Sequence, residues 1–261
     1  MRALTIAATG MLAQQTNVEV LSNNIANLNT TAYKRSRVEF QDLLYQDQRR
    51  VGSASSEAGT IVPAGLQVGL GVRAAAVYRL NQQGTLQLTE NTLDLGIRGE
   101  GFFNIQLPNG QTAYTRSGSF QLSPTGQVVT QDGYTVQPGI TVPQNTLDIS
   151  INASGQVYAK LDGVVAPQLL GQFTLSNFPN LAGLESVGQN LLLQTPASGN
   201  PIAGTPGTLG FGSVMQGFLE ASNVNAVAEI TNLITAQRAY ELNSKVIQAS
   251  DDMMGTINQL R

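Results

Sequence analysis

The sequence predicts an α+β protein, in which long N- and C-terminal helices pair as an α-helical coiled-coil domain and an all-β domain is inserted between them. Apolar residues recur at heptad spacing near both ends of the 261-residue chain. Between the ends, the apolar period changes to two and Gly, Pro, Asn and Asp punctuate the chain. The hydrophobic content of 41 % is enough to bury a core.

The N-terminal element is predicted as a helix over about residues 3–27. One line of apolar residues recurs every seven positions, and a second line lies three positions after it; the candidate subunit-assembly residues on these lines are Leu4, Met11, Val18, Leu21, Ile25 and Leu28. This pattern is an a/d seam, the stripe by which helices pair in a coiled coil. The polar cluster at residues 29–31 then leaves helical geometry and ends the element.

The C-terminal element is predicted as a helix over about residues 225–260, roughly 50 Å long at 1.5 Å per residue. Its heptad line continues the candidate assembly seam with Leu233, Tyr240, Ile247 and Met254, and Ile230 widens the same face. A second line beside it contains Val246, Met253 and Leu260. A periodic pattern of this length indicates a coiled coil more than a globular helix.

The middle of the chain is predicted as an all-β unit. Alternating segments such as residues 85–89 and 147–151 are separated by turn sequences such as Pro108-Asn109-Gly110. Residues 51–60 are small and polar and are predicted as a loop. The predicted domains are therefore a terminal helical assembly domain (1–44 and 217–261), a connector (45–80) and a β-rich outer domain (81–216).

Composition excludes several classes of function. The chain has no Cys and no His, so thiolate and imidazole catalysis and ordinary zinc sites are excluded, and no cofactor or metal is expected. A net charge of −3 argues against nucleic acid as a partner. No apolar run approaches the ~20 residues that span a bilayer, so no membrane insertion is expected. Cleavage of a signal peptide near Ala13 would cut the first helix in half, which argues against a cleaved signal.

Two features leave alternatives open. Charged residues make up only 12 % of the chain, which fits either a secreted polar domain or a subunit covered by copies of itself. The apolar seams fit helices that pair with each other and with neighbouring subunits, because an inserted β domain leaves part of each seam exposed. They also fit two ordinary helices packed across a sheet within one monomer.

Residues 21–35, Leu-Ser-Asn-Asn-Ile-Ala-Asn-Leu-Asn-Thr-Thr-Ala-Tyr-Lys-Arg, closely resemble the N-terminal signature of the flagellar rod and hook proteins. The resemblance continues through residues 98–103, 113–120, 216–225 and 237–245, and covers essentially the whole chain. Members of that family often carry Gly where this chain has Ala32. The signature residues are Ser22, Asn23, Asn24, Ile25, Ala26, Asn27, Tyr33 and Lys34.

The two consecutive asparagines of the signature are unusual inside a predicted helix, because Asn has a lower helix propensity than Ala. A frayed, solvated helix end would explain Asn23 and Asn24 without any function. The resemblance favours side-chain hydrogen bonds from both amides to adjacent subunits.

Residues 63–73 make the chain similar to the distal rod members of the family. Hook members usually carry a further large domain that 261 residues cannot hold. The resemblance implies that a segment after the first helix wedges between subunits and stiffens the rod; its candidate residues are Tyr45, Pro63, Gly65, Leu66, Gly69, Gly71 and Arg73. A proximal rod or hook-type axial protein is the nearest alternative.

The resemblance implies a structural, self-assembling subunit of the flagellar basal body and no catalytic residue. The subunit would pass unfolded through the flagellar type III export apparatus and form a helical homopolymer, the rod that crosses the periplasm and transmits torque to the hook. Its implied partners are copies of itself, proximal rod and hook-side axial proteins, bushing ring proteins and the export apparatus.

A carboxylate-based enzyme acting on peptidoglycan is the competing class, because Asp and Glu are the only acid-base groups available. The candidate carboxylates, Asp94, Glu100, Asp132 and Asp148, are scattered along the chain and form no spaced pair, and there is no Trp to stack a sugar. A secreted β-rich adhesin would explain the middle of the chain but neither heptad end.

Overall fold

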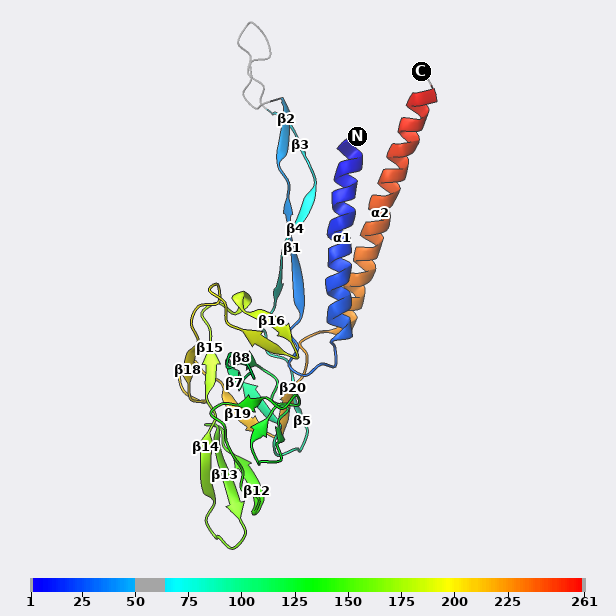
Figure 1. The fold of residues 1–261 in the computed structure, drawn as a ribbon. Coiled ribbons are helices and arrows are strands. Elements are labelled where there is room, and N and C mark those ends of the chain that lie inside the picture. Colours follow the sequence, from blue (N-terminus) through cyan, green and yellow to red (C-terminus); the bar gives the residue numbers. More distant parts are fainter. Residues whose placement is uncertain (1, 50–63, 260–261) are drawn as a thin grey trace. The chain divides into compact units, whose positions relative to one another are not determined.

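The computed structural model describes residues 2–49 and 64–259 (Figure 1). It contains a helix near each end of the chain and a β-rich region between them, so the predicted α+β class is confirmed. The predicted loop at 51–60, Pro63 and Leu260 lie outside the described residues.

The chain divides into two compact units that are interleaved in sequence. Unit 1 comprises Met1–Ala26, Ser36–Arg79 and Asn225–Arg261, and unit 2 comprises Asn27–Arg35 and Leu80–Val224. The end of the N-terminal signature therefore packs in the β-rich unit, while residues 45–49 and 64–79 of the predicted connector belong to the same unit as the helices. The division into assembly domain, connector and outer domain remains a prediction about function.

In unit 1, α1 (Arg2–Ala26) and α2 (Ala226–Gln259) contact each other. Small side chains allow this close approach, because Ala7 and Ala13 of α1 and Ala236 of α2 are buried. At Gly10 of α1, an added Cβ would lie 2.9 Å from the side-chain nitrogen of Asn243 on α2.

The start of α2 is set by an N-cap. The side-chain oxygen of Asn225 accepts a hydrogen bond from the backbone N–H of Ala228, at 3.2 Å. This satisfies one of the N–H groups that have no partner within the first turn of a helix.

The rest of unit 1 is an antiparallel ribbon. Its strands are β1 (Ser36–Asp42), β2 (Tyr45–Arg49), β3 (Leu66–Gly69) and β4 (Val72–Arg79), and β1 pairs with β4 while β2 pairs with β3. A register shift between Glu39 and Phe40 marks an irregularity in the first pair. Both β1 and β4 contact α1, so the ribbon lies against the first helix.

Unit 2 is built around one large antiparallel sheet with the strand order β16-β17-β8-β7-β11-β10-β9, and β15 pairs with both β7 and β18. These strands are β7 (Phe102–Gln106), β8 (Thr112–Thr115), β9 (Gln121–Leu122), β10 (Val128–Val129), β11 (Thr135–Val136), β15 (Leu175–Asn177), β16 (Glu185–Gly188), β17 (Leu191–Leu193) and β18 (Ile202–Gly204).

Smaller sheets complete unit 2. A three-stranded sheet contains β12 (Thr146–Ile151), β13 (Gln156–Leu161) and β14 (Gln168–Gln172). Two antiparallel pairs join β19 (Ser213–Gln216) to β6 (Leu95–Arg98), and β20 (Phe218–Glu220) to β5 (Leu86–Leu88); a 3₁₀ turn, η1, spans Leu181–Gly183.

The core of unit 2 is centred on aromatic side chains. Phe103, Phe120 and Phe173 are each at most 2 % exposed, and the rings of Phe103 and Phe120 meet edge to face with centroids 5.1 Å apart. A second cluster contains Phe102, Tyr114, Phe178 and Leu184. Burial of these large side chains makes unit 2 a compact body in its own right.

Candidate assembly site

The predicted seam lies on both helices but is only partly covered within the chain. On α1, Leu21 is buried and the other seam residues are half-buried: Leu4, Met11, Val18 and Ile25. Leu28 is also half-buried but belongs to unit 2. On α2, Leu233, Ile247 and Met254 are half-buried, whereas Ile230 and Tyr240 are exposed.

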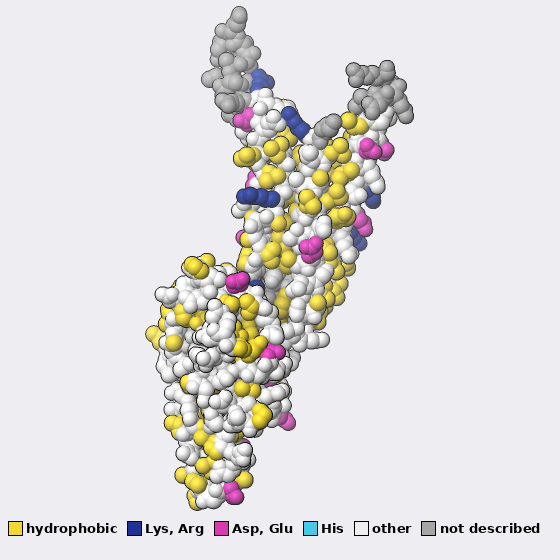
Figure 2. All heavy atoms as spheres, in the orientation of Figure 1, with side chains coloured by type: hydrophobic (Ala, Val, Ile, Leu, Met, Phe, Trp, Pro, Cys, Tyr) yellow, Lys and Arg dark blue, Asp and Glu magenta, His cyan; other side chains and the backbone are white. Residues whose placement is uncertain are grey.

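Further apolar side chains on α2 are exposed. Leu242, Val246 and Met253 are 62 %, 48 % and 59 % exposed, and their spacing of four and seven residues places them on one face of the helix. We call these three residues the exposed α2 stripe. Figure 2 shows hydrophobic side chains spread along both helices on the face in view.

One buried carboxamide joins the elements of unit 1. Asn24 donates to the backbone oxygen of Ser36 and accepts from its N–H, both at 2.8 Å. It also donates to the carboxylate of Glu229 on α2, at 3.2 Å. A single side chain on α1 therefore fixes the start of β1 and contacts α2, so an Asn with a poor helix propensity has a structural reason at this position.

The remaining signature residues are divided between the two units. Ser22, Asn23 and Ala26 are exposed on α1, and Ile25 is half-buried there, whereas Asn27, Tyr33 and Lys34 pack in unit 2. Asn23 and Asn24 both interact within the chain, and bonding of their amides to adjacent subunits remains a prediction.

Ala32 has a left-handed backbone, with φ of 57°. This conformation costs a residue with a Cβ about 1–2 kcal/mol relative to the right-handed region. Its N–H donates to the backbone oxygen of Glu220 at 2.7 Å, and that hydrogen bond helps to hold the strained turn.

A buried ion cluster lies next to this turn, within unit 2. The carboxylate of Glu220, at the end of β20, is 0 % exposed and lies 2.5 Å from the Lys34 ammonium and 2.7 Å from Nε of Arg116. The backbone N–H of Gly84 also donates to this carboxylate, at 2.8 Å. Arg116 donates further to the backbone oxygens of Gly101, at 2.8 Å, and Gly99.

Burial and the contacts within the cluster together explain the direction of the pKa shifts of Glu220 and Lys34. Burial raises the pKa of Glu220, but the charges and hydrogen bonds of Arg116 and Lys34 outweigh it and hold the pKa below its ordinary value. Burial lowers the pKa of Lys34, and the charge of Arg116 adds to this effect, whereas Glu220 opposes it. The cluster therefore favours the ionised form of Glu220.

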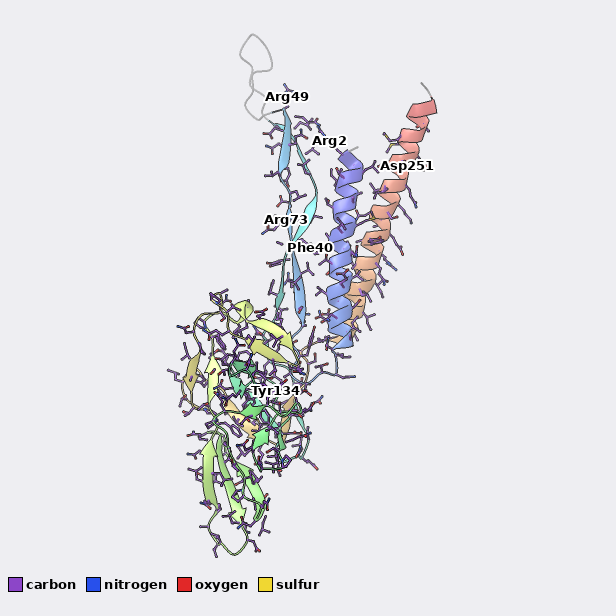
Figure 3. All side chains as sticks on the ribbon, in the orientation of Figure 1. Arg2, Phe40, Arg49, Arg73, Tyr134 and Asp251 are labelled. Carbon is purple, nitrogen blue, oxygen red and sulfur yellow. The ribbon has the colours of Figure 1, made fainter. Side chains whose placement is uncertain are left out.

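The candidate stiffening residues lie on the ribbon of unit 1. Tyr45 pairs with Gly69 across β2 and β3, and the side chain of Arg73 on β4 donates to Gln41 at 3.3 Å. Figure 3 shows Arg49 on β2 and Arg73 on β4 of this ribbon. Leu66 is exposed at the start of β3, and Gly65 precedes it.

Gly71, between β3 and β4, sets the approach of the ribbon to α1. Its φ is +121°, and an added Cβ would lie 2.1 Å from the Thr9 hydroxyl. That hydroxyl accepts a hydrogen bond from the N–H of Val72, at 3.3 Å. Only a residue without a side chain fits this place.

Comparisons with known proteins identify the family of this chain. Family models match at residues 4–34 (flagella basal body rod protein), 96–159 (flagellar hook protein FlgE/F/G D1 domain) and 215–260 (flagellar basal body rod FlgEFG protein, C-terminal). A flagellar basal-body rod protein FlgG of Caulobacter vibrioides is 59 % identical over 261 residues, which is 100 % of both chains.

The chain belongs to the FlgG family of flagellar basal-body rod proteins.

Other relatives show the breadth of the family. A FlgG of Borreliella burgdorferi is 47 % identical and covers 100 % of this chain and 99 % of its own. The flagellar hook-basal body complex protein FlhP of Bacillus subtilis is 31 % identical over the full length of both chains. The predicted distal rod protein is confirmed as a structural subunit of the flagellar basal body.

The enzyme alternative is not supported, because the family is structural. The four carboxylates considered for it have other local roles. Asp94 accepts hydrogen bonds from Thr89 and Asn91, and Glu100 accepts one from Asn177. Asp132 accepts one from Gln189, and Asp148 binds the backbone N–H that follows it.

Two further findings concern metals and membranes. Within residues 2–49 and 64–259, no three His, Cys, Asp or Glu side chains gather in a group that could hold a metal ion. No helix in the described part of the chain has the length and apolar character that crossing a membrane requires.

Sequence reasoning missed several residues that organise the junctions of this fold, namely Arg116, Glu220, Asn223 and Glu229. For Glu220 the sequence did contain a signal. It is a single acidic residue that follows two apolar residues, in a chain with only 12 % charged residues. A charge placed in an apolar strand is expected to have a buried partner. Which cation would serve as that partner could not be read from spacing.

Proposed function

We propose that this chain builds the rod by completing its apolar helix surfaces with other copies of itself. In this proposal α1 and α2 pair as a coiled coil, and the predicted seam together with the exposed α2 stripe is covered by helices of neighbouring subunits. The observation that carries the proposal is the exposed α2 stripe, whose three side chains are 48–62 % exposed among the described residues of the chain. Such apolar faces mark interaction surfaces.

The energetics favour this assembly. Fully burying one large apolar side chain contributes about 1.5–3 kcal/mol, and each copy offers several half-covered positions on its helices. The low content of charged residues, 12 %, reduces repulsion between neighbouring copies. A heterologous contact repeated from copy to copy produces an open helical polymer, which is the form a rod requires.

The other predicted roles follow from this arrangement. The ribbon that carries Tyr45, Leu66 and Arg73 would act as the stiffening segment between subunits, and residues 81–216 would form the outer domain facing the bushing ring proteins. Proximal rod and hook-side axial proteins would continue the same helical contacts at the two ends of the polymer. The chain would reach its place through the flagellar type III export apparatus, without a cleaved signal peptide, in the part of the rod that crosses the periplasm.

Replacement of Val246 by Asp tests the proposal. A carboxylate in the centre of the exposed α2 stripe would have to be buried in the assembled interface, and burial of an unpaired charge is strongly unfavourable. We expect the wild-type protein to form polymers at high concentration in sedimentation velocity, and the Val246→Asp variant to remain monomeric with an unchanged circular dichroism spectrum.

The matched control is Gln248→Asp. Gln248 is also exposed on α2, but it lies two residues from Val246 and hence about 200° around the helix. This variant should polymerise as the wild type does. Polymerisation of Val246→Asp at the wild-type concentration would contradict the assigned surface.

A further inference from the structure

Glu220 bonds to segments that lie far apart in the sequence, and ion pairing alone does not explain this arrangement. The residues bonded to it come from three separate segments: the one after α1, the one after β4 and the end of β8. We infer that Glu220 is a positioning residue, which with Lys34 and Arg116 fixes the places where the chain leaves the β-rich unit for the helices and the ribbon. This inference rests on the proposed function, because a subunit that assembles through its helices needs its chain to leave the β-rich unit at fixed points.

The contacts of Glu220 join backbone and side chain. Its backbone oxygen accepts the N–H of Ala32 at 2.7 Å, while its carboxylate binds Lys34 at 2.5 Å. The Lys34 ammonium also donates to the backbone oxygen of Gln82, at 2.7 Å. The segment 31–35, which follows α1 in the chain, is therefore held to β20 at two points and to the segment after β4 at a third.

Asn223, three residues further on, extends the same junction. Its side-chain oxygen accepts the N–H of Arg35 at 2.7 Å, and its side-chain nitrogen donates to the backbone oxygen of Leu80 at 2.9 Å. The N–H of Leu80 donates in turn to the backbone oxygen of Arg35, at 2.9 Å. Arg35, Leu80 and Val224 are three of the residues at which unit 2 gives way to unit 1. These three exits are thus tied together by the residues next to Glu220.

Stability alone is a weak explanation for a buried ion cluster. Replacing such a cluster with well-packed apolar residues is often neutral or stabilising, because the cost of desolvating the charges offsets their attraction. Hydrogen bonds, unlike apolar contacts, constrain direction as well as distance. The oxygens of Glu220 accept four of them, and each constrains the position of its donor.

The Glu220 carboxylate is also distinct from the aromatic rings at the centre of unit 2. Phe103, Phe120 and Phe173 pack with each other, and the bond from the ion cluster to this core runs from Arg116 to the backbone oxygen of Ile97, at 3.3 Å, without involving Glu220. Loss of the Glu220 carboxylate would therefore release the segments at the junction while the core sheet stays folded. This separation makes the inference testable in the monomer.

Distance measurement between spin labels tests it. The chain has no cysteine, so two introduced cysteines can be labelled cleanly. Asn29 is exposed in the segment after α1, Gln106 is exposed on β7 of the core sheet, and Lys160 is exposed on β13. The test pair is Asn29→Cys with Gln106→Cys, and the reference pair is Gln106→Cys with Lys160→Cys, both measured in the full chain as monomer.

In the otherwise unchanged chain we expect one narrow distance peak for each pair. Glu220→Gln should replace the narrow peak of the test pair with a broad distribution and leave the reference pair narrow. Lys34→Met, which retains the bond between Arg116 and Glu220, should broaden the test pair alone and to a smaller extent. It also serves as the second variant if Glu220→Gln does not fold.

Two results would overturn the inference. A test pair that stays narrow in both variants would show that the cluster does not fix the segment, and equal broadening of both pairs would show a general loss of stability in place of a positioning role. Because the measurement uses the monomer, it is independent of polymerisation. A wild-type protein that never polymerises would remove the proposed function and leave the distance result standing.

Discussion

At the scale of single residues, Glu220 links the stability of the fold to pH. Its pKa in the folded protein is below the ordinary value of 4.5, so its ionic bonds contribute stability that is present above about pH 4.5 and is lost as the pH falls through the folded value. At pH 7 we expect Glu220→Gln to lower the free energy of unfolding by roughly 3–5 kcal/mol, the usual cost of removing one partner of a buried pair.

The measurement is chemical denaturation of both proteins between pH 7 and pH 3. The difference in free energy of unfolding between wild type and Glu220→Gln should be constant near neutral pH and shrink in acid, because the wild-type carboxylate then becomes protonated. Glu185, exposed on β16, supplies the control variant Glu185→Gln, for which the difference should stay near zero. A Glu220→Gln difference that grows in acid would refute the assigned sign.

Residue identities in the signature could be predicted from the sequence, but their partners could not. Asn24 and Lys34 were both singled out, and both make bonds that organise the chain. Their partners Glu229 and Glu220 lie 205 and 186 positions away, and only the folded chain brings them together. Ala32 is a similar case, because its left-handed backbone is imposed by tertiary bonds in spite of its Cβ.

At the scale of elements, Gly71 determines how the ribbon lies on α1. We expect Gly71→Val to separate the ribbon near Gly71 from α1, because a Cβ at 2.1 Å from the Thr9 hydroxyl must displace the Thr9 side chain or one of the two backbones. The cost should be about 1–3 kcal/mol of unfolding free energy, from the clash together with the backbone strain of a β-branched residue at positive φ. Faster hydrogen exchange at the N–H of Val72 would report the separation.

Gly163→Val is the control for backbone strain without the clash. Gly163 has φ of +78°, and an added Cβ would meet nothing within 4 Å. Its strain should leave the exchange rate of Val72 unchanged. Equal hydrogen exchange at the N–H of Val72 in the Gly71→Val variant and in wild type would contradict the assigned contact between the ribbon and Thr9 of α1.

The elements that the sequence revealed are those whose pattern is set by local burial. Heptad spacing predicted both helices, because each buries one face against a partner. The ribbon strands were not predicted: β1 fell in the predicted assembly domain, and β2, β3 and β4 fell in the predicted connector. β2 is exposed on both faces, so it shows no alternation of buried and exposed residues. Its pairing depends on partners about twenty residues away, which no local pattern encodes.

At the scale of the whole molecule, the chain passes between its two units four times, after Ala26, Arg35, Arg79 and Val224. The predicted domains joined residues 1–44 with 217–261 but placed no boundary within residues 1–44, so they did not contain the two passages after Ala26 and Arg35. The β-rich class of the middle region could be predicted from turn residues and alternation. The packing of residues 27–35 with that region depends on the bonds around Glu220 and Asn223, which form only in the folded unit.

The two units also differ in how completely they are buried. Unit 2 has a core of large aromatic and aliphatic side chains, whereas the buried apolar residues of α1 and α2 are mostly alanines. Less apolar burial gives a lower free energy of local opening, so unit 1 should open more readily than unit 2 in the monomer. The same helices should become resistant to opening once neighbouring copies cover them.

Brief digestion with trypsin, followed by mass spectrometry, measures this difference. In the monomer we expect early cleavage after Arg238 and Lys245 on α2 and after Arg73 and Arg79 on β4, with a core of about residues 80–238 surviving longest. In the polymer, cleavage on α2 should slow, because the helix surfaces are buried. The Val246→Asp variant, held at polymer-forming concentration, should keep the monomer pattern. If α2 in a proven monomer resisted trypsin as long as the β-rich core does, its apolar surfaces would need no neighbour, and the proposed basis of rod assembly would be wrong.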